Sequence, residues 1–280
     1  MKRLISIELQ KLWRNRASKI LILSYFIILS FIALIASIKF EIFGFEIKLA
    51  EQGIFNFPYI WHFNTYVAMY LKFFLAIVIV SMMANEYTYS TLKQNLIDGM
   101  SKKEFMLSKT LTVVLFAGAS TLFIFLMSLI LGYSFSAYTE ASIVFSDMIY
   151  LAAYFVNLFA FFSFCLFAGI LVKRSAFALG FILVCYIAEG IVYGLLRWLV
   201  FTSSEATSRV ADFFPLTSIS NLVVEPFTRF KAYKAIEGAV QQGVAVPKDY
   251  GVHWYNVVIA LSWAIIFLLL SYRILKKRDL

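Results

Sequence analysis

Charged side chains are scarce in this sequence. Only 15% of its 280 residues are Asp, Glu, Lys or Arg, whereas 62% are hydrophobic and the mean hydropathy is +0.83. Soluble domains carry about 25% charged and about 45–50% apolar residues. The composition therefore excludes a soluble globular domain, and it equally excludes a disordered chain.

Cysteine and histidine are also few. Two Cys cannot form a disulfide framework, and Cys165 and Cys185 are predicted to be buried, inert thiols. The two histidines, His62 and His253, fall short of a zinc site, which usually needs four ligands, or three and a water. A glycine-rich phosphate loop with its lysine is missing as well. The sequence thus offers no candidate for a catalytic centre, a metal site or a cofactor site in this chain.

Six long apolar segments dominate what is present. Each has roughly the 20 residues that a helix needs to cross the hydrocarbon core, and none alternates as barrel strands do. All four prolines lie outside the segments. The predicted spans are 20–38, 62–84, 111–133, 148–172, 175–197 and 254–273. The predicted fold class is an all-α integral membrane protein with six transmembrane helices, formed as one domain over residues 1–280.

The basic residues predict the orientation. Most of the 25 Lys and Arg gather on one side, at the N-terminus, in the loop after the second span, between the fourth and fifth spans, and in the C-terminal tail. Cytoplasmic loops carry such an excess. Both termini are therefore predicted to be cytoplasmic. The net charge of +9 is then a topology signal, and no nucleic-acid partner is expected.

Three regions outside the spans have patterns of their own. Residues 1–18 have apolar and basic faces at helical spacing and predict an amphipathic helix at the membrane interface. Residues 85–110 form the one substantial cytoplasmic loop and predict helix, turn, helix, with Gly99 as a stop and Ser101 as a cap. Residues 198–253 are extracytoplasmic and predict a short helix near 228–242.

Two charges fall inside predicted spans. Lys72 lies in the second and Glu189 in the fifth, about 15 Å and about 12 Å below the outer ends at about 1.5 Å per residue. A charge in hydrocarbon normally faces a cavity or a partner. We expect the two side chains to meet near a central pathway. The alternatives are a purely structural ion pair, or a Lys72 side chain that snorkels toward the interface. Gly190 and Gly194 form a GxxxG pattern that predicts close helix packing.

The loop after the second span resembles a family pattern. The residues that carry the resemblance are Asn85-Glu86, Ser90-Thr91-Leu92-Lys93-Gln94-Asn95-Leu96, Gly99-Met100-Ser101-Lys102-Lys103-Glu104-Phe105 and Ser108-Lys109, together with the N-terminal run Ile7-Glu8-Leu9-Gln10-Lys11-Leu12-Trp13-Arg14. They are similar to type-2 permease subunits of ATP-binding-cassette exporters, and the resemblance covers the whole chain. The sequence departs from the family at Ser90, where a glycine is common.

The resemblance implies a function and its partners. The chain would be the permease of an exporter in a prokaryotic cytoplasmic (inner) membrane, and it would pair with a second permease copy, identical or not. A separate ATPase subunit would hold ATP and Mg, so this chain would need no cofactor and would not itself be an enzyme. The coupling residues would be Glu86, Thr91, Leu92, Lys93, Asn95 and Leu96 in loop 85–110. Lys72 and Glu189 would lie near the translocation path, and 198–253 would form the outer gate.

Other functions remain open at this stage. A secondary transporter should show inverted repeats or broken helices, and none is visible. A membrane-embedded enzyme should show clusters of His, Asp or Glu within the spans, which are also missing. A non-transporting sensor or immunity subunit on the same scaffold is compatible with the sequence. The exported substrate is not indicated.

Overall fold

The computed structural model describes residues 2–38, 40–42, 45–47, 53–201, 203–229 and 249–278. Six helices within these residues are long and apolar enough to cross a membrane, which confirms the predicted number. They are α2 (Arg16–Ser37), α3 (Tyr59–Thr88), α5 (Lys102–Phe135), α7 (Ile149–Val172), α8 (Ser175–Leu195) and α12 (Trp254–Lys277). The chain is thus an α-helical membrane protein.

Shorter elements connect the long helices. They are α1 (Lys2–Arg14), strands β1 (Phe40–Ile42) and β2 (Phe45–Ile47), α4 (Thr91–Ile97), α6 (Ala141–Val144), the π-helix η2 (Leu196–Val200), α9 (Ser204–Ala211), α10 (Pro215–Ser220) and the 3-10 turn η3 (Phe227–Arg229). The strands pair antiparallel in one hairpin. Most of the helix predicted near 228–242 lies outside the described residues.

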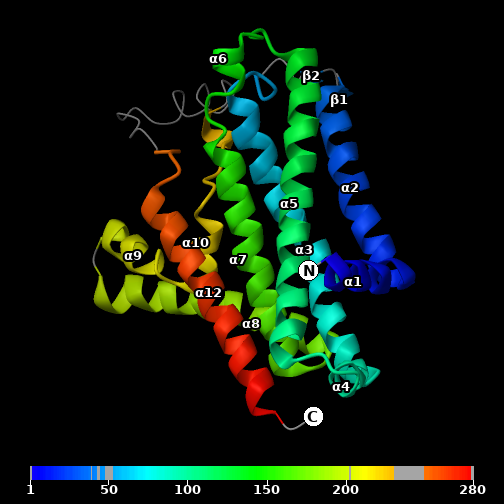
Figure 1. Ribbon diagram of the computed structural model, residues 1–280. Helices are drawn as coiled ribbons and strands as arrows, with labels where there is room; N and C mark the ends of the chain where they lie inside the picture. Colours follow the sequence, from blue (N-terminus) through cyan, green and yellow to red (C-terminus); the bar gives the residue numbers. More distant parts are fainter. Residues whose placement is uncertain are drawn as a thin grey trace.

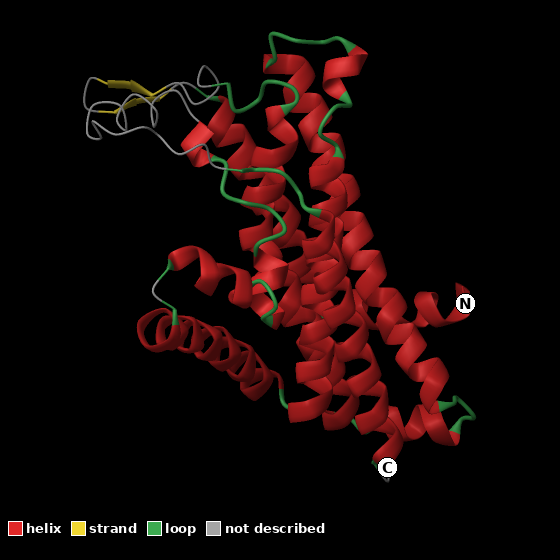
Figure 2. Ribbon diagram, turned by 90° about the vertical axis from the view of Figure 1, so that its left-hand side faces the viewer, coloured by secondary structure: helices red, strands yellow, loops and turns green. Residues whose placement is uncertain are grey.

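The bundle is built around α3 and α7. In their most apolar stretches 61% and 67% of the residues are buried, against 6% in α8. Figure 1 shows α4 and the end of α12 at one end of the bundle and α6 at the other. Helix α8 runs obliquely away from the bundle, and α9 returns beside it (Figures 1 and 2). Helix α10 packs against α7, α8 and α12, so the segment after α8 re-enters the protein.

Local signals fix where the helices begin. The predicted N-terminal helix 1–18 ends at Arg14, because Asn15 caps the next helix by accepting the Ser18 amide at 3.2 Å. The third long helix begins at Lys102, well before the predicted 111, because Ser101 and Glu104 form a capping box. Gly99 ends the preceding turn at φ +95°. The predicted helix, turn, helix is therefore confirmed, and its second helix is continuous with a membrane span.

Two glycines on α5 differ in how closely other residues pack against them, and substitutions at both test this packing. A Cβ at Gly132 would overlap the Phe57 ring, whereas a Cβ at Gly118 would meet nothing within 4 Å. Gly132→Ala is expected to lower the free energy of unfolding by about 1–3 kcal/mol through overpacking. Gly118→Ala, the control on the same helix, is expected to be neutral or stabilising by up to about 1 kcal/mol. Thermal unfolding of the purified chain in detergent measures both. Equal effects would contradict the packing of residue 57 on α5.

Candidate functional site

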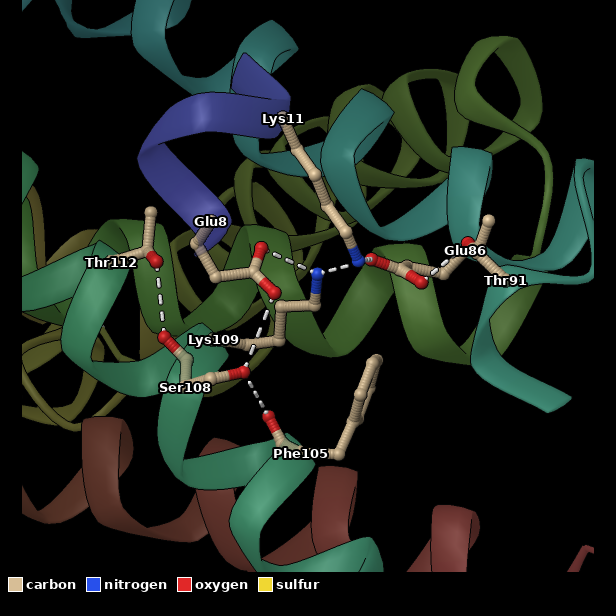
Figure 3. A network of polar contacts seen from close by, with 8 residues as sticks. All are labelled: Glu8, Lys11, Glu86, Thr91, Phe105, Ser108, Lys109 and Thr112. Atoms are coloured by element: carbon tan, nitrogen blue, oxygen red, sulfur yellow. Dashed lines mark hydrogen bonds and ion pairs between the residues drawn. The ribbon is translucent and has the colours of Figure 1, made fainter. Parts of the chain in front are cut away.

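Four helices meet at a buried cluster of charges near the α4 end of the bundle. The charge cluster consists of Glu8 and Lys11 on α1, Glu86 on α3, Thr91 on α4 and Lys109 on α5 (Figure 3). Lys109 Nζ lies 2.6 Å from Glu86 Oε1 and 2.7 Å from Glu8 Oε2. Lys11 Nζ lies 2.9 Å from Glu86 Oε1, and the Thr91 hydroxyl donates to Glu86 Oε2 at 2.6 Å.

Burial makes the ion pairs of this cluster important for holding the helices together. The exposed fractions are 0% for Lys109 and 3% for both Glu8 and Glu86. An ammonium shared by two carboxylates, with a second lysine at the edge, leaves the cluster neutral overall. Removing one partner from a buried ion pair leaves an uncompensated buried charge. This lowers stability far more than the loss of an exposed ion pair does. The cluster therefore holds α1, α3, α4 and α5 in one arrangement.

Helix α4 is attached to this cluster at its first residue. Ser90, at the position where the family often has Gly, adopts the left-handed conformation that glycine favours, with φ +54°. The chain can therefore turn sharply after α3 and present Thr91 to the Glu86 carboxylate. Glu86 thus anchors the end of α3, as the resemblance implies, and also the start of α4.

The outward face of α4 differs from the one expected from the sequence. Leu92 is buried within the chain at 2% exposure, and Leu96 is half-buried against the same core. The apolar surface of Leu92 is therefore covered by the chain itself, and that of Leu96 is partly covered. Ile97 is 75% exposed, and it lies beside exposed Lys93 and Gln94. Asn95 is half-buried. The exposed face of α4 therefore includes Ile97, Lys93 and Gln94, whereas Leu92 faces the core.

Lys72 and Glu189 do not meet. Lys72 Nζ donates to Asn157 Oδ1 on α7 at 3.1 Å, which also excludes snorkelling as its main role. The Glu189 carboxylate accepts from the backbone N–H groups of Leu216 and Thr217 and from the Thr217 hydroxyl, each at 2.8 Å. The direct pairing was wrong because the two side chains have different partners: Glu189 binds the start of α10, whereas Lys72 binds Asn157 on α7, which in turn donates to the Ile219 carbonyl of α10.

Helix α10 is bound near both ends by polar side chains of other helices. Glu189 is bound to the free N–H groups of its first turn, and Asn157, the partner of Lys72, donates through Nδ2 to the Ile219 carbonyl near its last turn. The negative charge of Glu189 at the helix N-terminus complements the helix dipole. Lys72 is linked to α10 only through Asn157, and Glu189 and Asn157 together hold α10 inside the protein.

Several other predicted residues have plain structural roles. Gly190 and Gly194 are exposed, and a Cβ on either would meet nothing within 4 Å, so neither packs against another helix of the described chain. His62 bonds the Val224 carbonyl through Nε2 at 2.6 Å, and Cys165 is buried and free. No group of three or more potential metal ligands occurs among the described residues.

Sequence reasoning missed three residues of these sites. Glu8 and Lys109 belong to the motifs quoted above, but their meeting depends on how α1 packs on α5. A lone acidic residue in a basic amphipathic helix was the available signal for Glu8. Asn157 was visible as a polar residue inside an apolar span, but nothing local showed that it would accept from Lys72.

Comparison with known proteins gives a family. The family described as "Protein of unknown function (DUF2705)" matches residues 26–280, which include everything from within α2 to the C-terminus. Glu86, Lys109, Lys72 and Glu189 lie in the matched region, whereas α1 lies before it. No curated protein matches the chain. The chain belongs to the DUF2705 family of proteins of unknown function.

Proposed function

We propose that this chain is the membrane-spanning permease subunit of an ATP-binding-cassette exporter. A separate ATPase subunit would dock on α4 and supply ATP and Mg, and a second permease copy would complete the path. In this arrangement both termini and α4 face the cytoplasm, and the membrane is the prokaryotic cytoplasmic one.

One observation carries the proposal. A seven-residue helix presents an exposed apolar side chain, Ile97, while its own base is bound into the buried charge cluster. A solvated connector would need neither feature. A force applied to α4 would reach α3 and α5 through Glu86 and Lys109, and α1 through Glu8.

The link from α4 to the membrane is short. Thr91 contacts Glu86 near the end of α3, and α3 is the span that also carries Lys72. Helix α5 follows α4 in the chain and continues directly into another span. A partner that changes shape when it binds nucleotide can shift the helix bundle between two arrangements. It does so only if it binds one arrangement more tightly than the other. The exposed face of α4 is where we propose that contact.

Co-purification tests this function. The chain, pulled from its native membrane in mild detergent, is expected to bring down an ATPase subunit. Ile97→Asp is expected to reduce the recovered ATPase at least about tenfold, since it places a charge in a contact whose hot spot would be apolar. Tyr138→Asp, a matched change at an exposed site (52%) beyond the other end of α5, should leave recovery unchanged.

Two results would count against the proposal. Recovery of the chain alone, without any ATPase, would remove the driving subunit and favour a secondary transporter. Equal recovery from both Asp variants would show that α4 is not the contact. An ATPase that binds while no substrate flux is found would instead identify a non-transporting sensor on this scaffold.

A further inference from the structure

Lys72 is a buried cation without an anion. It lies near the middle of α3, is 3% exposed, and stands 4.5 Å above the Phe161 ring. An ammonium has three donor protons, but its one hydrogen-bond acceptor among the described residues is Asn157 Oδ1. No carboxylate of the described part of the chain forms an ion pair with it.

Holding α10 does not require this charge. Asn157 itself donates to the Ile219 carbonyl, and a neutral amide at position 72 could serve Asn157 equally well. A charge at this depth is costly and normally faces a cavity or a partner. The role of Lys72 as a structural support therefore leaves its positive charge unexplained.

A cavity of about 420 Å³ lies beside Lys72. It is bounded by α3, by α8 and by the segment that follows α10, and its size is within the range of small-molecule sites, about 300–1,000 Å³. Hydroxyl groups line part of it, from Tyr66, Tyr70 and Tyr186. Such groups donate hydrogen bonds to oxygen anions. Lys72 and these three tyrosines line the same cavity, and the Tyr66 and Tyr70 hydroxyls also bond each other at 2.6 Å.

Another part of the wall is apolar and extends to the outside of the chain, and Ser220 and Asn221 add polar groups. The apolar side chains are those of Met69, Phe73 and Val223. The cavity opens outward here, since Phe73 is 44% exposed and the neighbouring Tyr70 is 60% exposed. Glu225 also lines the cavity, but its carboxylate accepts from the Phe227 amide and the Thr228 hydroxyl, each at 3.0 Å. The site thus offers a deep cation, hydroxyl donors and an apolar flank.

We propose that this cavity binds the acidic headgroup, carboxylate or phosphate, of an amphiphile, with Lys72 as its counter-ion. The headgroup would take the free donor protons of the ammonium, and the tail would follow the apolar flank toward the bilayer. That the bound amphiphile is also the exported cargo rests on the proposed function; the binding itself does not.

The test measures binding by the purified full-length chain alone, without ATPase. Native mass spectrometry, after release from a non-ionic detergent, gives dissociation constants for dodecanoate, dodecyl phosphate, dodecyltrimethylammonium and inorganic phosphate. We expect both anionic amphiphiles to bind at least about tenfold more tightly than the cationic one, as a charge-assisted contact in a buried site implies. We expect inorganic phosphate to bind more weakly than dodecyl phosphate.

Variants locate the site. Lys72→Met is expected to abolish the preference for anions, while Lys72→Arg keeps it, and Lys103→Met, an exposed lysine on α5, leaves it unchanged. Equal binding of anionic and cationic amphiphiles by the unaltered chain overturns the proposal without any variant. Retention of the preference in Lys72→Met overturns it also. If inorganic phosphate binds as tightly as dodecyl phosphate, the tail contributes nothing to binding, and the proposal that the ligand is an amphiphile is overturned. Because these outcomes do not involve an ATPase, they are distinct from failure of the proposed function.

Discussion

Lys109→Met is expected to lower the free energy of unfolding by about 3–5 kcal/mol, the usual effect of removing one partner from a buried ion pair. The methionine fills a similar volume, but it leaves the carboxylates of Glu8 and Glu86 buried without their shared cation. Lys11 still contacts Glu86, at 2.9 Å, and compensates for only one of them. The loss is measured by thermal or denaturant unfolding of the purified chain in detergent.

A control lies on the same helix. Lys103 is exposed in the first turn of α5, so Lys103→Met is expected to change stability by no more than about 0.5 kcal/mol. Adding Glu8→Gln to Lys109→Met should recover part of the loss, because it removes one of the two stranded carboxylates. If the two methionine variants were equally stable, the charge cluster would not hold the four helices together.

Glu189→Leu is expected to release α10 from the protein and to cost about 2–5 kcal/mol. The carboxylate accepts three hydrogen bonds, two of them from backbone N–H groups that have no other partner within the helix. Bonds to a charged group contribute about 1.5–3 kcal/mol each, although such losses do not add fully. Leucine replaces none of them.

The reactivity of a cysteine on α10 toward a water-soluble label measures this release directly. Ser218 on α10 is 2% exposed, so a cysteine placed there, in a chain whose own two cysteines are replaced, should resist a water-soluble maleimide. With Glu189→Leu the same cysteine is expected to react at least about tenfold faster, as a lost tether of a few kcal/mol implies. Glu205→Leu is the control, since Glu205 is 78% exposed and pairs with Arg209 at the surface. Protection that survives Glu189→Leu would mean that packing alone holds α10.

The membrane spans were predictable because each is defined by its own residues. A continuous apolar run of about 20 residues needs no knowledge of its neighbours. Boundaries were less well predicted where a helix continues into polar sequence. Helix α5 begins at Lys102 because of its capping box, and its first turns mix charged with apolar residues and so lack the continuous apolar run that marks a span.

The sites were only partly predictable. Glu86 and Thr91 were found through the resemblance, whereas Glu8 and Lys109 come from helices far apart in the chain and meet through packing. Leu92 was assigned to a partner because it is apolar and lies in the loop predicted to be cytoplasmic, but the seven-residue α4 buries this side chain against its own protein. Exposure of Ile97 depends on how α4 is rotated, which the sequence does not show.

The intramembrane charges illustrate the same limit. Depth along the spans placed Lys72 and Glu189 at similar levels, but it could not reveal that the two side chains have different partners. Helix α10 has six residues and is too short to register as a span, and it interacts with Glu189 through backbone N–H groups that any sequence would supply. Its position became visible only with the packing of α7, α8 and α12.

The most direct test of the central claim is a photo-crosslink from α4 in the native membrane. A photoreactive amino acid at position 97 should give an adduct with an ATP-binding subunit, because Ile97 is 75% exposed at the proposed contact. The same probe at position 138, beyond the other end of α5, should give none. An ATPase adduct from position 97 alone is the result we predict. Absence of any ATPase adduct from position 97, with the chain intact and the probe incorporated, would contradict the account.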